Sequence, residues 1–352
     1  MNQFGNFFRW HAAAHPRARA GAFFSYALLW RCGSATAFLL LVGCHGQQSA
    51  LDPAGREAAQ LARLFWAMAA GALLIWGAVL GLSFYSVRVS PEKGRRQANL
   101  FIVVFGAALP TGILAALLMY GLSILPGQVA QAPPDALKVF VDGEQWWWRV
   151  RYQLPDGKSF ALANEIRLPV GEPVQFELRS SNVIHAFWIP SIGGKKDMIP
   201  GRVTHLALTP TRTGIYRGAC AEYCGTSHAF MAFYTVVMEK EEFTRWTMRQ
   251  SEDAARPSPG LIERGQKLFL ANGCGACHAI RGTRAQGLIG PDLTHVGSRL
   301  SIGAGILPAT RKSFAEWIQK VHRLKPGVLM PHFGMLPEED VQAMAAYLEE
   351  LK

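Results

Sequence analysis

Two long apolar stretches dominate the first third of the chain. Residues 62–87 and 98–125 contain almost no charge besides Arg63. Each is longer than the roughly 20 residues that an α-helix needs to cross the hydrocarbon core of a bilayer. Both are therefore predicted to be transmembrane helices. Pro110 lies inside the second stretch and predicts a kink there.

Basic residues between these stretches indicate how the helices are oriented. Arg88, Lys93, Arg95 and Arg96 lie in the connecting segment. Because Lys and Arg are enriched in cytoplasmic loops, this segment is expected in the cytoplasm and both ends of the hairpin outside. The formal net charge of +11 is accordingly attributed to membrane topology, and nucleic acid is not expected as a partner.

A shorter apolar run precedes the first helix. Residues 35–43 are too few to span a bilayer but match the length of a signal-peptide core. The sequence Leu41-Val42-Gly43-Cys44 resembles a bacterial lipoprotein signal. Residues 1–43 are therefore interpreted as a cleaved signal peptide and Cys44 as the lipidated first residue, with an uncleaved signal anchor as the alternative.

Beyond the hairpin, assigned to residues 44–130, the pattern changes to short strand-like runs. Gly, Pro and Asp turns separate them, which predicts a β-sandwich or barrel over residues 131–240. The expected strands are 137–150, 173–178, 203–208 and 232–238. A polar helix and a linker ending at Pro257-Ser258-Pro259 are expected over residues 241–259.

The last part of the chain, residues 260–352, has the pattern of a small helical domain. Helices are expected at 261–271, 312–322 and 337–351. Pro337 suits the first position of the last of these, and acidic residues follow it at the positive end of the helix dipole. The chain is thus expected to be multidomain: a two-helix transmembrane hairpin, a β domain and an all-α domain.

Soft metal ligands are concentrated near the end of the β domain. Two thiolates, an imidazole and a thioether (Cys220, Cys224, His228 and Met231) lie within twelve residues, and His185 is on an earlier strand edge. This donor set favours copper. A mononuclear blue-copper site needs one cysteine, so the second favours two coppers bridged by both sulfurs. A Cys220–Cys224 disulfide and a structural zinc site are the alternatives, and neither explains Met231.

These residues reproduce the pattern CxExCxxxHxxM, and over roughly residues 60–240 the chain resembles cytochrome c oxidase subunit 2. The resemblance implies a cupredoxin-like domain with a dinuclear copper A (CuA) centre, a magnesium ion bound by the Glu222 carboxylate at the contact with the catalytic subunit, and a role for Trp146 over the copper site where electrons enter. The copper ligands that it implies are His185, Cys220, Glu222 through its carbonyl, Cys224, His228 and Met231.

Two positions depart from the family pattern. Asn182 stands where the family usually has Asp, which leaves no carboxylate there. Arg95-Arg96-Gln97 stands where the family usually has a glutamate that helps to deliver protons at the start of the second helix. No proton entrance is therefore assigned to this chain.

Three consecutive tryptophans, Trp146, Trp147 and Trp148, follow Gly143-Glu144-Gln145 on a predicted strand. Side chains alternate between the two faces of a strand, so at least one indole is expected to be exposed. Core packing or anchoring at the membrane interface is an equal alternative for Trp147 and Trp148.

The sequence Cys274-Gly-Ala-Cys277-His278 is a CxxCH motif for covalent attachment of haem c, with His278 as one axial ligand. The surrounding helices resemble a small class I cytochrome c, which implies a methionine as second axial ligand. Met330, in Lys325-Pro326-Gly327-Val328-Leu329-Met330-Pro331, resembles the ligand loop of that family and is favoured over Met335. The remaining alternatives are His295, His322 and His332.

Together the two resemblances imply subunit 2 of an aa-type (caa-type) cytochrome c oxidase, EC 7.1.1.9, fused to a cytochrome c. The expected path runs from a soluble cytochrome c or other donor to haem c, then to CuA, then to subunit 1, where oxygen is reduced with proton pumping. Subunits 1 and 3 and membrane lipid are the expected partners. The expected location is the bacterial inner membrane, with both redox domains on the periplasmic face.

Three other classes of protein share some of these features with the expected oxidase subunit. A membrane-anchored electron-transfer protein without an oxidase partner is the main alternative, although one anchor would suffice for it. Quinol-oxidase subunit 2 normally lacks the copper ligands, and nitrous-oxide reductase normally carries its copper motif in a soluble enzyme.

Overall fold

The computed structural model describes residues 45–88, 95–154 and 156–352. The predicted signal peptide, Cys44 and Lys93 lie outside these residues, so those predictions stay open. The first apolar stretch forms helix α2 (Arg56–Arg88), and the second forms α3 (Arg95–Val103), a π-helical turn η1 (Val104–Ala108) and α4 (Leu109–Val129).

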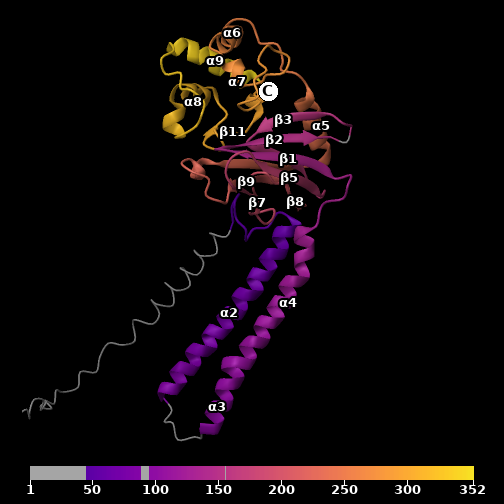
Figure 1. The fold of residues 1–352 in the computed structure, drawn as a ribbon, viewed down its shortest axis with the longest axis vertical. Helices are drawn as coiled ribbons and strands as arrows, with labels where there is room; N and C mark the ends of the chain where they lie inside the picture. The colour runs from indigo at the N-terminus through magenta and orange to yellow at the C-terminus, as the bar shows by residue number, and fades with distance from the viewer. Residues whose placement is uncertain (1–44, 89–94, 155) are drawn as a thin grey trace, which may run out of the picture. The chain divides into compact units, whose positions relative to one another are not determined.

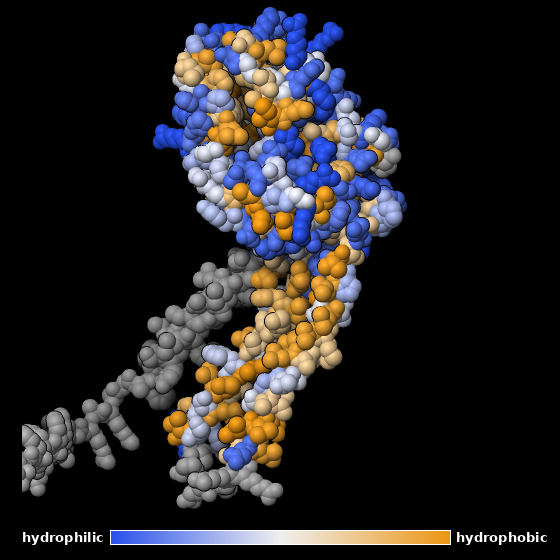
Figure 2. All heavy atoms as spheres, in the orientation of Figure 1, coloured by the Kyte–Doolittle hydropathy of each residue, from blue (hydrophilic) through white to orange (hydrophobic). Residues whose placement is uncertain are grey.

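Both apolar helices are long and hydrophobic enough to cross a membrane. Their large apolar side chains are exposed, and Figure 2 shows hydrophobic residues covering both helices below the polar domains. The Gln128 amide donates a hydrogen bond to the Gln60 side chain at 2.7 Å and joins α4 to α2. An exposed apolar surface of this kind is stable in lipid, where both helices satisfy their own backbone hydrogen bonds.

The irregularity expected at Pro110 takes the form of the π-helical turn. Pro110 is the second residue of α4, directly after η1. Proline has no N–H group and its ring crowds the carbonyl four residues earlier. A wider turn accommodates both effects without ending the helix.

The β domain consists of two five-stranded sheets (Figure 1). The first has the order β3 (Ser159–Ala163), β2 (Trp147–Gln153), β1 (Leu137–Glu144), β5 (Val174–Ser180) and β8 (Thr204–Leu208). The second has the order β4 (Glu165–Pro169), β10 (Ala232–Met238), β9 (Gly214–Cys220), β6 (His185–Trp188) and β7 (Lys196–Met198). The core contains the buried rings of Trp148, Phe187 and Phe233, the last two stacked 4.9 Å apart. The predicted cupredoxin-like sandwich is confirmed.

The single strand predicted over residues 137–150 is wrong. The chain turns at Gln145 and Trp146, so that β1 and β2 form an antiparallel hairpin in which Glu144 pairs with Trp147. Side-chain contacts hold the turn, because Gln145 and Trp146 both donate hydrogen bonds to the Cys224 carbonyl, at 2.8 and 2.9 Å. Seventy-eight residues separate the partners of the Trp146 bond, which local sequence patterns do not reveal.

The start of α2 is attached to the sandwich. The Thr209 N–H donates to the Glu57 carboxylate at 2.9 Å, and the Arg56 N–H donates to the Thr209 carbonyl at 3.0 Å. A Cβ atom on Gly55 would lie 2.1 Å from the Ile192 carbonyl oxygen, so only glycine fits there. The first apolar helix therefore begins directly against the β domain.

The C-terminal domain is mostly helical, as predicted. Helix α5 (Lys240–Ser251) leads into it, and its own elements are α6 (Leu261–Ala271), α7 (Cys274–Cys277), η3 (Val296–Ser298), β11 (Ser301–Ile302), β12 (Leu307–Pro308), α8 (Arg311–Leu324) and α9 (Glu338–Glu350). The short β11–β12 pair departs from the all-α expectation. Helix α8 begins after Thr310, whose hydroxyl accepts from the Ser313 N–H.

Helices α6 and α9 approach closely at Gly265. A Cβ atom there would lie 2.1 Å from the Ala343 carbonyl oxygen and 2.8 Å from the Tyr347 Cβ. One turn further on, the Phe269 and Tyr347 rings pack edge to face with centroids 6.0 Å apart. The absence of a side chain at Gly265 thus allows the two helices to make their contact.

We predict that Gly265→Ala lowers the free energy of unfolding of this domain by about 2 kcal/mol, because the new methyl group forces the helices apart. Helix propensity alone predicts the opposite sign, a gain of about 1 kcal/mol. Denaturant unfolding followed by haem absorbance measures the difference. Lys267→Ala, at an exposed position on the same helix, is the control, and an unchanged or higher stability for Gly265→Ala would contradict the packing argument.

Candidate metal centre and haem pocket

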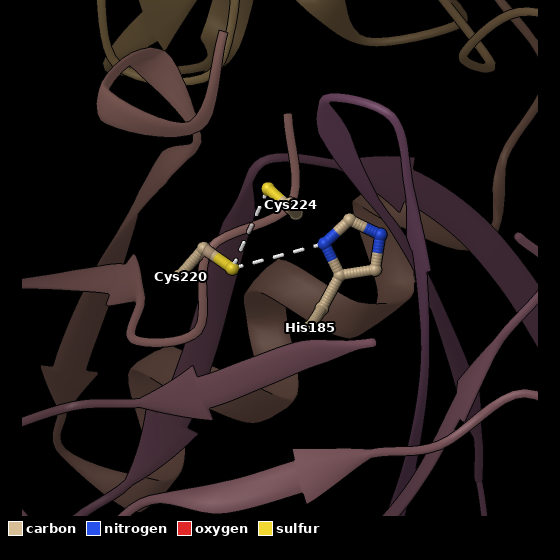
Figure 3. Close-up of side chains that lie close together, drawn as sticks. All are labelled: His185, Cys220 and Cys224. Atoms are coloured by element: carbon tan, nitrogen blue, oxygen red, sulfur yellow. Dashed lines mark hydrogen bonds between the residues drawn. The ribbon is translucent and has the colours of Figure 1, made fainter. Parts of the chain in front are cut away.

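Three buried side chains from different elements meet at one end of the sandwich. His185 is the first residue of β6, Cys220 is the last of β9, and Cys224 is on the loop that follows. The His185 Nδ1 lies 3.7 Å from the Cys220 sulfur, and the two sulfurs lie 3.8 Å apart (Figure 3). Among the described residues, these three form a group whose ligand atoms all lie within 4.8 Å of one another.

The remaining candidate ligands lie around this group. The His228 Nδ1 is 3.4 Å and the Met231 sulfur is 3.7 Å from the Cys224 sulfur. The Glu222 carbonyl oxygen is 3.1 Å from the Cys220 sulfur, whereas the Glu222 carboxylate is half-exposed and lies 3.8 Å from the Lys195 ammonium. The structure thus brings together all six residues that the motif singled out.

The donor atoms fit a soft metal. Two thiols, two imidazoles, a thioether and a carbonyl oxygen are characteristic of copper, and zinc has no use for the thioether. The two thiols are free in the structure and form no disulfide. Their mutual interaction lowers the pKa of Cys220 and raises that of Cys224, and a metal ion would displace the remaining proton because the thiolate is the ligand.

Asn182 orients the His185 ring. Its side-chain oxygen lies 3.2 Å from the His185 Nε2, which directs Nδ1 toward the Cys220 sulfur. The β1 backbone fixes the other side, since a Cβ atom on Gly143 would lie 2.9 Å from the ring. An amide oxygen therefore occupies the position of the missing carboxylate and accepts the imidazole N–H, as the partners of metal-binding histidines usually do.

The prediction that at least one of the three tryptophans is exposed is wrong. Trp146 and Trp148 are buried and Trp147 is half-buried. Trp148 packs in the sandwich core, 5.2 Å from the Phe233 ring. Trp146 is covered from the C-terminal domain, where a Cβ atom on Gly327 would lie 2.9 Å from its ring. The alternation of side chains along a strand predicts which face each one is on, but it does not show that a second domain packs on that face and buries Trp146.

A cavity of about 580 Å³ lies between the CxxCH motif and the β domain. Its lining includes Cys274, Cys277, His278 and Met330 from one domain and Trp146 and Trp147 from the other. Apolar side chains such as Phe269, Phe314 and Leu348 form much of the remaining wall. A largely apolar, concave site of this size suits a haem.

His278 is oriented to present one nitrogen to the cavity. Its Nδ1–H donates to the Pro291 carbonyl at 2.8 Å, which leaves the Nε2 lone pair free. A Cβ atom on Gly290 would lie 2.6 Å from the imidazole, so the chain packs directly against the ring. Burial lowers the pKa of His278 and favours the neutral ring that binds iron.

The alternatives to Met330 lie away from the cavity wall. Met335 is 70% exposed and does not line the cavity. The His295 Nε2 lies 3.1 Å from the Glu252 carbonyl, and His322 lies beside the Met330 carbonyl and the His332 ring. None of these three histidines lines the cavity.

Two cationic residues that the sequence did not single out also line this cavity. Lys325 is fully buried beside Trp146, and Arg299 donates to the Asp292 carbonyl at 2.5 Å. Burial lowers the pKa of both groups, that of Lys325 to about 7. A buried cation is costly unless hydrogen bonds compensate it, and the Lys325 ammonium group has three carbonyl acceptors. The sequence context of the two cationic residues carries no signal of their burial.

Two known families match separate parts of this chain. The family cytochrome c oxidase subunit II, periplasmic domain, matches residues 151–239, and the family cytochrome c matches residues 262–352. Cytochrome c oxidase subunit 2 of Alkalihalophilus pseudofirmus is 31% identical over 331 residues, which are 89% of this chain and 94% of that protein. The Bacillus subtilis protein of the same name is 32% identical, over 62% of this chain and 63% of its own length. The solved periplasmic domain of subunit II of cytochrome oxidase from Bradyrhizobium japonicum is 32% identical, over 34% of this chain and 96% of that one, with a TM-score of 0.31.

We predict that Asn182→Leu lowers copper affinity by about 10- to 100-fold, because the His185 ring loses the acceptor that orients it. Asn182→Asp keeps an acceptor oxygen and should bind copper nearly as tightly as the parent chain. Ser181→Leu, at the exposed preceding position, is the control for added bulk. Competition titration against a copper chelator gives the affinities, and parental affinity in Asn182→Leu would show that the contact has no positioning role.

Proposed function

The chain belongs to the cytochrome c oxidase subunit 2 family, and from this membership we propose that it is the electron-accepting subunit of a haem-copper oxidase of the aa type, EC 7.1.1.9. Oxygen reduction and proton pumping would take place on subunit 1. The observation that carries the proposal is the position of Trp146. Its indole N–H donates to the Cys224 carbonyl, and its ring lies against Gly327 in the segment 325–331, called the haem loop. One side chain thus contacts both candidate sites.

The proposed copper ligands are the side chains of Cys220, Cys224, His185, His228 and Met231 together with the Glu222 carbonyl. The proposed haem residues are Cys274 and Cys277, which would attach the haem covalently, and His278 and Met330, which would bind its iron; all four line the cavity. Bound haem c and a copper pair would each accept and release single electrons, which would give the chain a route from a soluble donor to subunit 1.

Burial at the copper site and hydrogen bonds at both sites hold the candidate ligands in place. His185, Cys224 and Met231 are at most 2% exposed. Asn182 and Pro291 each accept an imidazole hydrogen bond that orients a ligand ring. A site that is held in one geometry needs little rearrangement when its charge changes, which suits electron transfer.

Further parts of the proposal rest on the family resemblance. They are a soluble cytochrome c or equivalent donor, oxidase subunits 1 and 3 as partners, lipid around α2 and α4, and a bacterial inner membrane with both redox domains on the periplasmic side. Lipidation at Cys44 after removal of residues 1–43 belongs with them, as do the domain boundaries near residues 130, 240 and 260. Magnesium at the Glu222 carboxylate is also proposed, and that carboxylate is accessible for it.

A membrane-anchored electron carrier without an oxidase partner remains the second candidate. The two long helices α2 and α4 favour the oxidase subunit, because a carrier needs only one anchor. Purification of the intact complex, followed by oxygen uptake with reduced cytochrome c, separates the two. An isolated chain without oxygen uptake would favour the carrier.

We predict that Cys220→Ser reduces oxygen uptake by the purified complex at least about 100-fold, because a hydroxyl does not replace a thiolate as a soft ligand. Copper content should fall in parallel while the haem c spectrum stays unchanged. Thr226→Ser, at an exposed position of the same loop, should keep parental values. Full activity in Cys220→Ser would disprove the copper assignment.

We predict that Met330→Leu changes the haem c spectrum and lowers its reduction potential, because a methionine ligand raises the potential. Met335→Leu should leave both unchanged, since its side chain is 70% exposed. Redox titration of the two full-length variants compares them directly. The opposite pattern would assign the ligand to Met335.

A further inference from the structure

Lys325 has an unusual environment at the C-terminal end of α8. It is 2% exposed and is among the largest fully buried side chains of the described residues. Its ammonium group donates to the carbonyl oxygens of Trp146 at 2.6 Å, Phe230 at 2.8 Å and Gly303 at 3.0 Å. An ammonium group has three N–H donors, so each of them has one acceptor.

The acceptors belong to both domains. Trp146 is in the β1–β2 turn, Phe230 directly precedes the candidate ligand Met231, and Gly303 is in the haem domain itself. One side chain therefore connects the haem domain to the turn at Gln145 and Trp146, called the tryptophan turn, and to the end of the segment 220–231, called the copper loop. No carboxylate forms a salt bridge with Lys325 in the part of the chain that the structure describes. Three backbone carbonyls accept its N–H groups, and the charge of the nearby Cys224 thiolate acts to raise the Lys325 pKa against the effect of burial.

Neighbouring contacts complete this junction. The Ser227 hydroxyl donates to the Pro326 carbonyl at 2.6 Å. On the far side, the Leu300 N–H donates to the Glu165 carboxylate at 2.7 Å, and Glu165 is only 3% exposed. The hydrogen bonds of Ser227 and Leu300 connect the β domain to the haem domain and do not involve the Lys325 side chain. Their loss would therefore show independently that the two domains have separated at this junction.

Lys325 also stands at the start of the haem loop. Pro326 and Gly327 follow it, and Met330 lies five residues further on. Because the Lys325 side chain is anchored on the β domain, the position of this loop depends on that anchor. The Gly327 backbone then packs against the Trp146 ring at a distance that leaves no room for a Cβ atom.

We propose that Lys325 is a positioning residue that locks the haem loop onto the copper loop and so sets the rate of electron transfer between the two sites. This rests on the proposed function, because it assumes that both sites carry redox centres. The locking itself depends only on the protein's hydrogen bonds. Loss of the ammonium group leaves three buried carbonyls without donors, which opens the junction rather than either domain.

The test compares Lys325→Met with the control Lys312→Met, at an exposed position on α8, the helix that Lys325 directly follows. Hydrogen exchange on the full-length chain should show faster exchange of the Leu300 amide in Lys325→Met. The Ile280 amide bonds to the Ala285 carbonyl within the haem domain and should keep its rate. Laser-triggered reduction of haem c in the loaded chain should then show electron transfer to copper slowed by on the order of tenfold or more. The absorption spectra of haem c and of the copper centre should stay unchanged.

Three results would overturn the proposal. One is parental Leu300 exchange in Lys325→Met, and another is a parental electron-transfer rate. The third is equal acceleration of the Leu300 and Ile280 amides, which would show that Lys325 stabilises only its own domain. Absence of any electron transfer in the parent chain would refute the proposed function instead, and the exchange experiment would still decide whether Lys325 locks the junction.

Discussion

The copper loop is closed by a backbone hydrogen bond between its two ends. The Cys220 N–H donates to the Met231 carbonyl at 2.9 Å, and the next amide, of Ala221, donates to the Ala186 carbonyl at 3.0 Å. These two bonds extend the β9–β10 and β6–β9 pairings to the rim of the sandwich. They bring Cys220, Met231 and the strand that carries His185 close together. The arrangement of the candidate ligands therefore depends on the pairing of the strands as well as on the sequence motif.

The same loop also supports the second domain. The Cys224 carbonyl accepts two side-chain hydrogen bonds that hold the Gln145–Trp146 turn, and that turn presents a carbonyl to Lys325. The haem cavity is in turn walled partly by Trp146 and Trp147. Copper loop, tryptophan turn and haem loop therefore form one continuous set of contacts. In a fused chain this arrangement replaces the encounter of two separate proteins with a fixed junction, at a high effective concentration.

Motifs and hydrophobic patterns in the sequence predicted the features that depend on neighbouring residues in the chain. The CxExCxxxHxxM and CxxCH motifs predicted residues that the fold gathers at two sites, and the amphipathic run at Leu261–Ala271 predicted a helix with the observed ends. The prediction failed where distant residues decide the outcome. The strand expected over residues 137–150 is broken by bonds to Cys224, and the burial of Trp146 depends on Gly327 and Lys325. The sequence around Lys325 gives no indication that its side chain is buried or that its ammonium group has three carbonyl acceptors.

We propose that electrons enter through the C-terminal domain, because that domain covers Trp146 beside the copper loop. Rapid mixing of the loaded full-length chain with a reduced soluble cytochrome c, with absorbance followed at the bands of both centres, tests it directly. The account predicts that the haem c band changes first and the copper band follows at a rate independent of donor concentration. A copper band that changes first, or at a rate proportional to donor concentration while haem c stays oxidised, would contradict it.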